Sequence, residues 1–226
     1  GIVLYLHNRK SASNTLFFFI SISTVCWSIA NYFSLQPGDP IAILKWVRLV
    51  LFFATPHAIL FLLFINNFPA DKLLLSRLKR WLAAVIGLVT MMITLTPYVF
   101  SRMMVSNQGL APMPGPLMPL FGLVVFGSLI MGLVLMIMKY RTAVPSERLK
   151  WEFMLFGIFL SYFLIILTNF VFVILFDNPM FNVFGPLFML PAIIGMGYAI
   201  VRHQLLNVKI ITTEIFVFLI LSVSVI

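Results

Sequence analysis

The stretch MPLFGLVVFGSLIMGLVLMIM, from Met118 to Met138, contains no Asp, Glu, Lys or Arg. A helix needs about 20 apolar residues to cross the hydrocarbon core of a bilayer, so this stretch predicts a transmembrane helix. Five further long apolar stretches flank it, which gives six complete predicted spans. These five are Thr15 to Leu35, Leu44 to Ile65, Trp81 to Phe100, Phe153 to Phe176 and Val183 to Val201.

The composition of the whole chain leads to the same fold class. Of the 226 residues, 62% are hydrophobic and only 9% are charged, whereas about a quarter of a typical soluble domain is charged. The apolar runs are continuous rather than alternating, which favours helices over a membrane β-barrel. Apolar residues at Gly1 to Leu6 and Ile215 to Ile226 predict two partial spans at the chain ends. We therefore expect an all-α, polytopic transmembrane helix bundle.

The basic residues predict the orientation of this bundle. Lys and Arg collect in cytoplasmic loops, so the side with more of them is expected to face the cytoplasm. One orientation places 12 basic residues inside and 3 outside, and it leaves the amino-terminal end outside. The 12 are Arg9, Lys10, Lys72, Arg77, Lys79, Arg80, Lys139, Arg141, Arg148, Lys150, Arg202 and Lys209, and the 3 are Lys45, Arg48 and Arg102. The net charge of +9 thus reports topology, and we expect no nucleic-acid partner.

Several kinds of chemistry are excluded by residues that the spans lack. No Lys lies in Val183 to Val201, so a retinal Schiff base has no attachment point. The six carboxylates lie in loops or at helix ends, which argues against a proton-coupled transporter and an intramembrane protease. The single cysteine, Cys26, forms no disulfide framework, and no phosphate loop, nucleophile elbow or zinc motif occurs. We expect no catalytic residues, no metal and no cofactor in this chain.

Three polar residues within reach of the membrane interior are candidates for function. Arg48 lies about one turn below the predicted outer boundary, where it either snorkels to headgroups or meets an anion or amide inside the bundle. His57 follows Pro56, and a bond to a carbonyl freed by the proline kink is favoured over a ligand role. Asn169 is most simply a hydrogen-bonding contact between helices.

The predicted outer loop from Arg102 to Met118 is rich in Pro, Gly and Met. Methionine thioethers bind Cu(I), which makes a copper site one interpretation of this loop. Met is common throughout the chain, with 13 in all, and ordinary apolar packing is therefore the favoured reading.

A set of short motifs resembles the N-terminal seven-transmembrane sensor region of bacterial histidine kinases, in order and in spacing. The match extends from the end of the first helix to about Val208, and its last motif is the most specific. The motifs are Asn14 to Phe17, Trp46-Val47-Arg48-Leu49 with Pro56, Phe68-Pro69, Arg148-Leu149-Lys150-Trp151, Asn169, Gly185-Pro186, and Tyr198 to Val208.

The resemblance implies a sensory module that passes a stimulus to a cytoplasmic output domain. Residues 1–208 are expected to form the seven-transmembrane region with a truncated first helix, and residues 209–226 to begin an additional helix. The resemblance also implies a multi-pass protein of the bacterial inner membrane and a homodimer formed through the full-length kinase. The competing interpretation is a small-solute transporter, which would use discontinuous helices at a midplane site. A passive membrane anchor is the third interpretation, because the sequence shows no trace of a ligand or stimulus.

The input site is expected in the outer half of the bundle, lined by Trp46, Arg48, Tyr98 and Asn169. Its small ligand or membrane stimulus is unknown. The output is expected to leave the membrane through the last motif, with Tyr198, Arg202 and His203 as the coupling residues.

Overall fold

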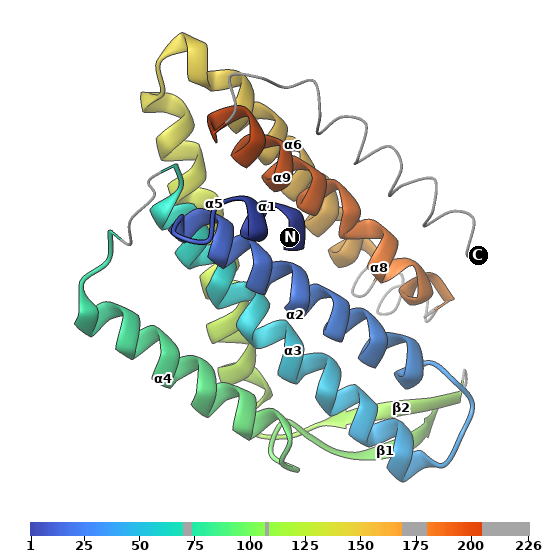
Figure 1. The fold of residues 1–226 in the computed structure, drawn as a ribbon. Coiled ribbons are helices and arrows are strands. Elements are labelled where there is room, and N and C mark those ends of the chain that lie inside the picture. Colours follow the sequence, from blue (N-terminus) through green and yellow to red (C-terminus); the bar gives the residue numbers. More distant parts are fainter. Residues whose placement is uncertain (70–73, 107–108, 169–179, 205–226) are drawn as a thin grey trace.

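The computed structural model describes residues 1–69, 74–106, 109–168 and 180–204. The chain is a bundle of long helices with a short β-hairpin at one end (Figure 1). The helices are α1 (Ile2–His7), α2 (Ala12–Ser34), α3 (Pro40–Asn67), α4 (Arg77–Thr94), α5 (Met118–Thr142), α6 (Pro145–Ile166), the 3-10 helix η2 (Met180–Phe184), α8 (Gly185–Phe188) and α9 (Leu190–Gln204). The predicted all-α polytopic bundle is confirmed.

The starts of the long helices follow from local sequence. Ser11, Asp39 and Ser76 precede α2, α3 and α4, and each side chain accepts a backbone N–H from three residues further on. Such caps satisfy one of the N–H groups that a first helical turn leaves without a partner. Pro40 and Pro145 stand in the first turns of α3 and α6, where the missing proline N–H is not needed.

Five helical segments are long and apolar enough to cross a membrane: Ala12–Ser34, Pro40–Asn67, Met118–Thr142, Pro145–Ile166 and Phe181–Arg202. The predicted sixth span, Trp81 to Phe100, is wrong in its extent, because α4 ends at Thr94 and Phe100 begins a strand. Pro97 explains the early end, since a proline disfavours helical backbone at the residue before it. The helix α4 also carries three basic residues in its first turn, and it is not among the five segments.

The expected loop from Arg102 to Met118 contains a β-hairpin. Strand β1 (Phe100–Ser106) pairs antiparallel with β2 (Gly109–Pro114), with an irregularity near the start of β1. Strand pairing gives the backbone groups of this segment hydrogen-bond partners within the protein. Gly115 anchors the second strand, because its N–H bonds Val99 O at 2.7 Å and a Cβ at this position would collide with the Tyr98 carbonyl.

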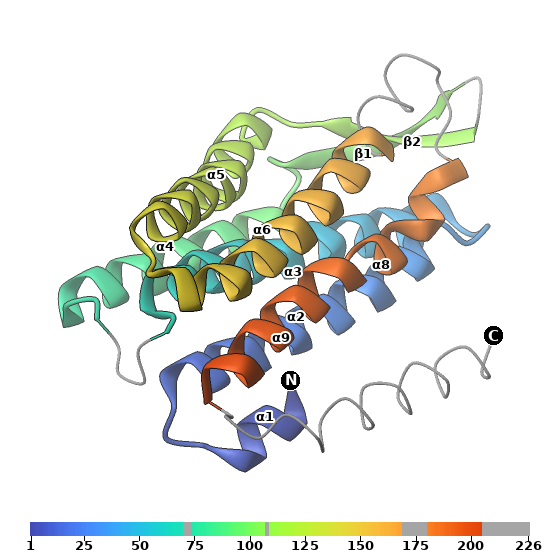
Figure 2. The same cartoon turned by 90° about the horizontal axis from the view of Figure 1, so that it is seen from above.

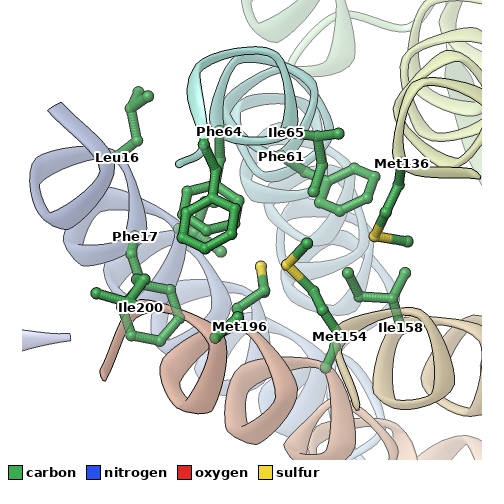
Figure 3. Close-up of a cluster of buried hydrophobic side chains, with 14 of the residues drawn as sticks. Leu16, Phe17, Phe61, Phe64, Ile65, Met136, Met154, Ile158, Met196 and Ile200 are labelled. Carbon is green, nitrogen blue, oxygen red and sulfur yellow. The ribbon is translucent and has the colours of Figure 1, made fainter. Parts of the chain in front are cut away.

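The core lies between α2, α3, α5, α6 and α9 (Figure 3). Phenylalanine, isoleucine and methionine side chains from these five helices converge there, and all are almost completely shielded from solvent. Among the largest of them are Ile20, Phe61, Phe64, Ile65, Met136, Met154, Ile158, Met196 and Ile200. The outward faces are also apolar: Leu123 is 72% exposed and Phe156 is 67% exposed. Apolar residues on both the inside and the outside are typical of a helix bundle that lies in lipid.

The charged residues separate the two ends of the bundle. We call the end with β1, β2 and the α2–α3 connection the hairpin end, and the opposite end, with α1 and the α5–α6 connection, the basic end (Figure 1). Of the 12 basic residues predicted to be cytoplasmic, the ten in the described ranges all lie at the basic end; Lys72 and Lys209 lie outside those ranges.

Candidate functional site

At the hairpin end, Arg48 of α3 is held by backbone carbonyl groups. Its Nε and Nη2 atoms donate to Phe100 O at 3.1 and 2.7 Å, Nη2 also donates to Ser101 O at 3.4 Å, and Nη1 donates to Leu95 O at 3.4 Å. The guanidinium group therefore binds α3 to the end of α4 and to the start of β1. Sequence reasoning missed these partners because they depend on the hairpin, where the sequence predicts a loop.

The other three residues of the expected input site have different neighbours. The Trp46 ring stacks on Phe33 of α2, with ring centroids 4.6 Å apart and an interplanar angle of 23°. Trp46 and Arg48 are two positions apart on α3, so they point to different sides of that helix. Tyr98 lies between α4 and β1 and is 58% exposed. Asn169 lies outside the described residues, so a pocket shared by all four residues stays a prediction.

In the middle of the bundle, His57 joins three helices. Its Nδ1 atom lies 3.1 Å from Thr24 Oγ1 of α2, and its Nε2 atom lies 3.4 Å from the Tyr162 hydroxyl of α6. All three side chains are at least half-buried, and His57 is only 8% exposed. The expectation that His57 bonds a carbonyl freed by Pro56 is wrong, because two hydroxyl groups occupy its ring nitrogens instead.

The hydrogen-bond pattern assigns the tautomer of His57. Thr24 Oγ1 donates its single proton to Ile20 O at 2.9 Å, so toward His57 it acts as an acceptor. Nδ1 must then carry the hydrogen, which leaves Nε2 to accept from the Tyr162 O–H group. The chain runs from Tyr162 through His57 and Thr24 to a backbone carbonyl, which cannot pass a proton on. It is therefore a fixed contact between α2, α3 and α6 rather than a proton relay.

At the basic end, Lys139 of α5 covers the last turn of α3. Its Nζ atom donates to Ile65 O at 2.7 Å, Asn66 O at 2.8 Å and Phe68 O at 2.6 Å. These carbonyls belong to the end of a helix, where the backbone dipole also favours a cation. The ammonium group uses all three of its donors there, and it lies 5.9 Å from the centre of the Trp151 ring.

Two motifs that carry the resemblance meet at this place. The Phe68 and Trp151 rings are 5.4 Å apart and nearly perpendicular, at 76°. Lys150 lies 5.7 Å from the centre of the Phe68 ring, and its Nζ donates to Glu147 Oε1 at 2.7 Å. The connection that follows α3 is thereby packed against the start of α6.

The last helix, α9, lies along α6 and also touches α2 (Figure 2). Gly157 of α6 and Gly195 of α9 face each other: a Cβ on Gly157 would collide with Pro191 O, and one on Gly195 would lie 2.8 Å from Phe153 O. Such a close crossing requires glycine on both helices. Small residues therefore bring the backbones of α6 and α9 into direct contact.

The expected coupling residues lie on the last turns of α9. The Tyr198 ring packs against Phe153 of α6, with centroids 4.8 Å apart, and the Tyr198 hydroxyl accepts from Arg202 Nη1 at 3.4 Å. His203 is the penultimate residue of α9.

At the break before α9, a side chain that the sequence did not indicate as functional supplies a hydrogen-bond partner for the backbone. The last transmembrane segment is interrupted between α8 and α9, close to Pro191. There the backbone N–H of Ala192 donates to Ser161 Oγ at 2.9 Å, and the Ser161 side chain is fully buried. No sequence signal marked Ser161 or Tyr162, and Lys139 was identified only as one of the 12 basic residues, since the partners of all three lie on a helix that is distant in the chain.

This arrangement defines the class of protein: a multi-pass membrane helix bundle whose buried polar groups join helices to one another. Within the described ranges, no group of three His, Cys, Asp or Glu residues could hold a metal ion. A family model described as the N-terminal 7TM region of histidine kinase matches residues 1–209, and the chain belongs to this family. No curated protein and no solved structure gives a significant match.

The family description fits the order of the helices. Within the described residues, α1 to α6 and the last segment formed by η2, α8 and α9 are seven successive segments. Five of these segments are long and apolar enough to cross by themselves, while α1 has 6 residues and α4 has 18. The resemblance drawn from the motifs is thus confirmed.

Proposed function

We propose that this chain is the membrane-embedded sensory module of a bacterial sensor histidine kinase, in the plasma membrane, and that it passes a stimulus to a cytoplasmic output domain of the full-length protein. The observation that carries the proposal is the family match over residues 1–209. The chain itself performs no catalysis; autophosphorylation belongs to the output domain. The full-length protein acts as a homodimer formed through its kinase region.

The orientation proposed for the module places the basic end in the cytoplasm and the hairpin end outside. The distribution of basic residues supports it. Cysteine labelling in a Cys26→Ala background tests it with Ser76→Cys at the basic end and Ser106→Cys at the hairpin end. An impermeant reagent added to intact cells should label the second variant and spare the first; the reverse pattern contradicts the orientation.

The input site is proposed at the hairpin end, with Arg48 as its central residue and Trp46, Tyr98 and Asn169 nearby. Support comes from the partners of Arg48, which are neutral carbonyl groups rather than carboxylates. A guanidinium group held in this way keeps its full positive charge for an anionic or polar stimulus. A stimulus that binds better to one arrangement of Arg48 and the hairpin shifts the population toward that arrangement.

The output is proposed to leave through α9, with Tyr198, Arg202 and His203 as coupling residues. The close crossing of Gly157 and Gly195 supports this route, because backbones in direct contact move together or slide along each other. The contact between Tyr198 and Phe153 lies on the same interface, nearer the basic end. A change in α6 is therefore transmitted to the end of α9.

The alternative is a small-solute transporter, and the interruption between α8 and α9 is the observation that favours it. Transporters use such breaks to offer free backbone groups to a substrate. Here the Ala192 N–H group is already bonded by Ser161. This bond leaves that N–H group unavailable to a substrate and argues against a transporter, and uptake of small solutes by proteoliposomes containing the chain would reverse the preference.

The test of the input site uses the full-length protein in liposomes, with autophosphorylation as the output. Arg48→Gln should change the basal level of phosphorylation several-fold without loss of membrane insertion. Arg102→Gln is the matched control, because Arg102 is an exposed cation on β1 at the same end. Wild-type output from both variants would remove the support for an input site at Arg48.

A further inference from the structure

The first half of α4 differs from the other long helices because the protein does not cover it. The buried residues of α4 are Gly87, Thr90 and Thr94, all in its second half. There α4 packs on α3, where a Cβ on Gly87 would lie 2.9 Å from Ile59 Cδ1. No residue from Arg77 to Ile86 is buried, and α4 lies at the edge of the bundle (Figure 1).

This uncovered half combines two chemical characters. Its apolar part presents large exposed side chains, among them Leu78 at 69%, Trp81 at 70% and Leu82 at 52% exposure. Its first turn carries Arg77 and Lys79 together with Arg80, and no acidic residue. Trp81 thus stands at the border between a cationic turn and an apolar surface, which is where amphipathic rings lie at a membrane interface.

The cations of α4 differ from other cations of the basic end in what they contact. Lys139 is bound by three carbonyl groups, and Lys150 is paired with Glu147. Arg77 and Lys79 are both exposed, and within the described ranges neither side chain has a hydrogen-bond or ion-pair partner. Arg77 and Arg80 are three positions apart and therefore lie on the same side of α4, whereas Lys79 points to a different side. Positive charges without a counter-charge among the described residues attract an anion from outside the protein.

Arg80 adds a fixed point to this cluster. Its Nη1 atom donates to Leu75 O at 2.5 Å, which holds the guanidinium group next to the first turn, and its other N–H groups have no partner among the described residues. A phosphate group has the geometry that such a planar donor set recognises.

We propose that Arg77 and Arg80 of the first turn of α4, with Lys79 as a neighbouring positive charge, bind the phosphate of an anionic phospholipid whose acyl chains lie along Trp81 and the exposed leucines. The positive charges favour an anionic headgroup. The exposed apolar surface that follows them along α4 favours a lipid over a free anion. A second copy of the chain is a poorer occupant, because a symmetric contact would bring the two cationic turns together.

Tryptophan quenching by brominated lipids tests the proposal on the complete protein in nanodiscs. The Trp81 signal is the difference between the wild-type protein and Trp81→Phe. Brominated phosphatidylglycerol should quench it more strongly than brominated phosphatidylcholine at the same mole fraction, with a relative affinity of roughly fivefold or more. The double variant Arg77→Gln/Arg80→Gln should bring this ratio close to one.

The matched control is the double variant Lys10→Gln/Arg141→Gln, which removes two other exposed cations from the basic end. It should keep the preference. Equal quenching by the two lipids in the wild-type protein, or an equal loss of preference in the control, overturns the proposal. A Trp81 fluorescence that neither lipid quenches also overturns the proposal, because another protein chain would then cover this face. Displacement of phosphatidylglycerol by inorganic phosphate at constant ionic strength overturns it as well, since the site would then take the free anion.

Discussion

Both ends of the bundle hold a cation with backbone carbonyl groups, but the carbonyls come from different kinds of structure. The three that bind Lys139 lie within Ile65 to Phe68, at the end of a single helix. Those that bind Arg48 lie at Leu95, Phe100 and Ser101, on both sides of a turn. Lys139 therefore stabilises one helix end that already exists. Arg48 connects three elements, and their relative positions depend on it.

This difference indicates which end of the bundle can change its structure more easily. A helix end closed by three charged hydrogen bonds has few alternative arrangements of similar energy. The turn and the start of the hairpin are hydrogen-bonded to α3 through the Arg48 side chain, so they can shift relative to α3 when that side chain finds another partner. The hairpin end thus suits the input of a sensor, and the basic end suits the fixed platform against which α9 moves.

The largest expected effect is on stability, from Lys139→Met. The substitution keeps a long side chain and removes the three hydrogen bonds, so the free energy of unfolding should fall by about 2 to 3 kcal/mol. Unfolding of the protein in mixed micelles by sodium dodecyl sulfate measures it. Arg141→Met, an exposed cation two positions further on α5, should change the value by less than about 0.5 kcal/mol. Equal stabilities for the two variants would contradict the assigned role of Lys139.

A smaller stability effect and a clear dynamic one are expected from Arg48→Gln. Glutamine is shorter and has one NH₂ group, so it cannot reach the same carbonyls, and we expect a loss of about 1 kcal/mol. Hydrogen–deuterium exchange should accelerate at the backbone amides of β1 and the preceding turn. Amides at the end of α3 should exchange as in the wild-type protein.

The two ends can be compared directly through this measurement. If Arg48→Gln accelerated exchange equally at the end of α3 and in β1, the ends would form one cooperative unit. The distinction between a changeable end and a fixed end would then be lost.

The sequence predicted the helices well and their contacts poorly, for physical reasons. A long uncharged run such as Met118 to Met138 has few stable forms in lipid besides a spanning helix. The hairpin was missed because strand pairing between β1 and β2 depends on contacts across a turn, while Pro and Gly in the same segment indicate a loop. The partners of Arg48 were missed with it.

The polar contact of His57 shows the same limit. Its ring nitrogens meet Thr24 and Tyr162, which lie 33 and 105 positions away in the chain. The sequence identified a polar residue that needs a partner inside the bundle, but the identity of the partner depends on how α2 and α6 cross α3. No periodicity within one helix contains that information.

The smallest expected effect concerns this contact, which lies between the two ends. Hydrogen bonds between transmembrane helices contribute roughly 0.6 kcal/mol on average, so Tyr162→Phe should lower the free energy of unfolding by about that amount.

The tautomer of His57 gives a sharper test, because Thr24 donates to Ile20 O and leaves Nδ1–H as the only way to pair with it. Nitrogen NMR of labelled histidine should find His57 protonated at Nδ1, and Tyr162→Phe should leave it so. Thr24→Val removes the acceptor of Nδ1–H, so it should shift the tautomer population toward Nε2–H. A ring protonated at Nε2 in the wild-type protein would contradict the assigned tautomer. Nε2–H would then donate to the Tyr162 hydroxyl and Nδ1 would accept from Thr24, so the chain of hydrogen bonds would run from α2 through α3 to α6.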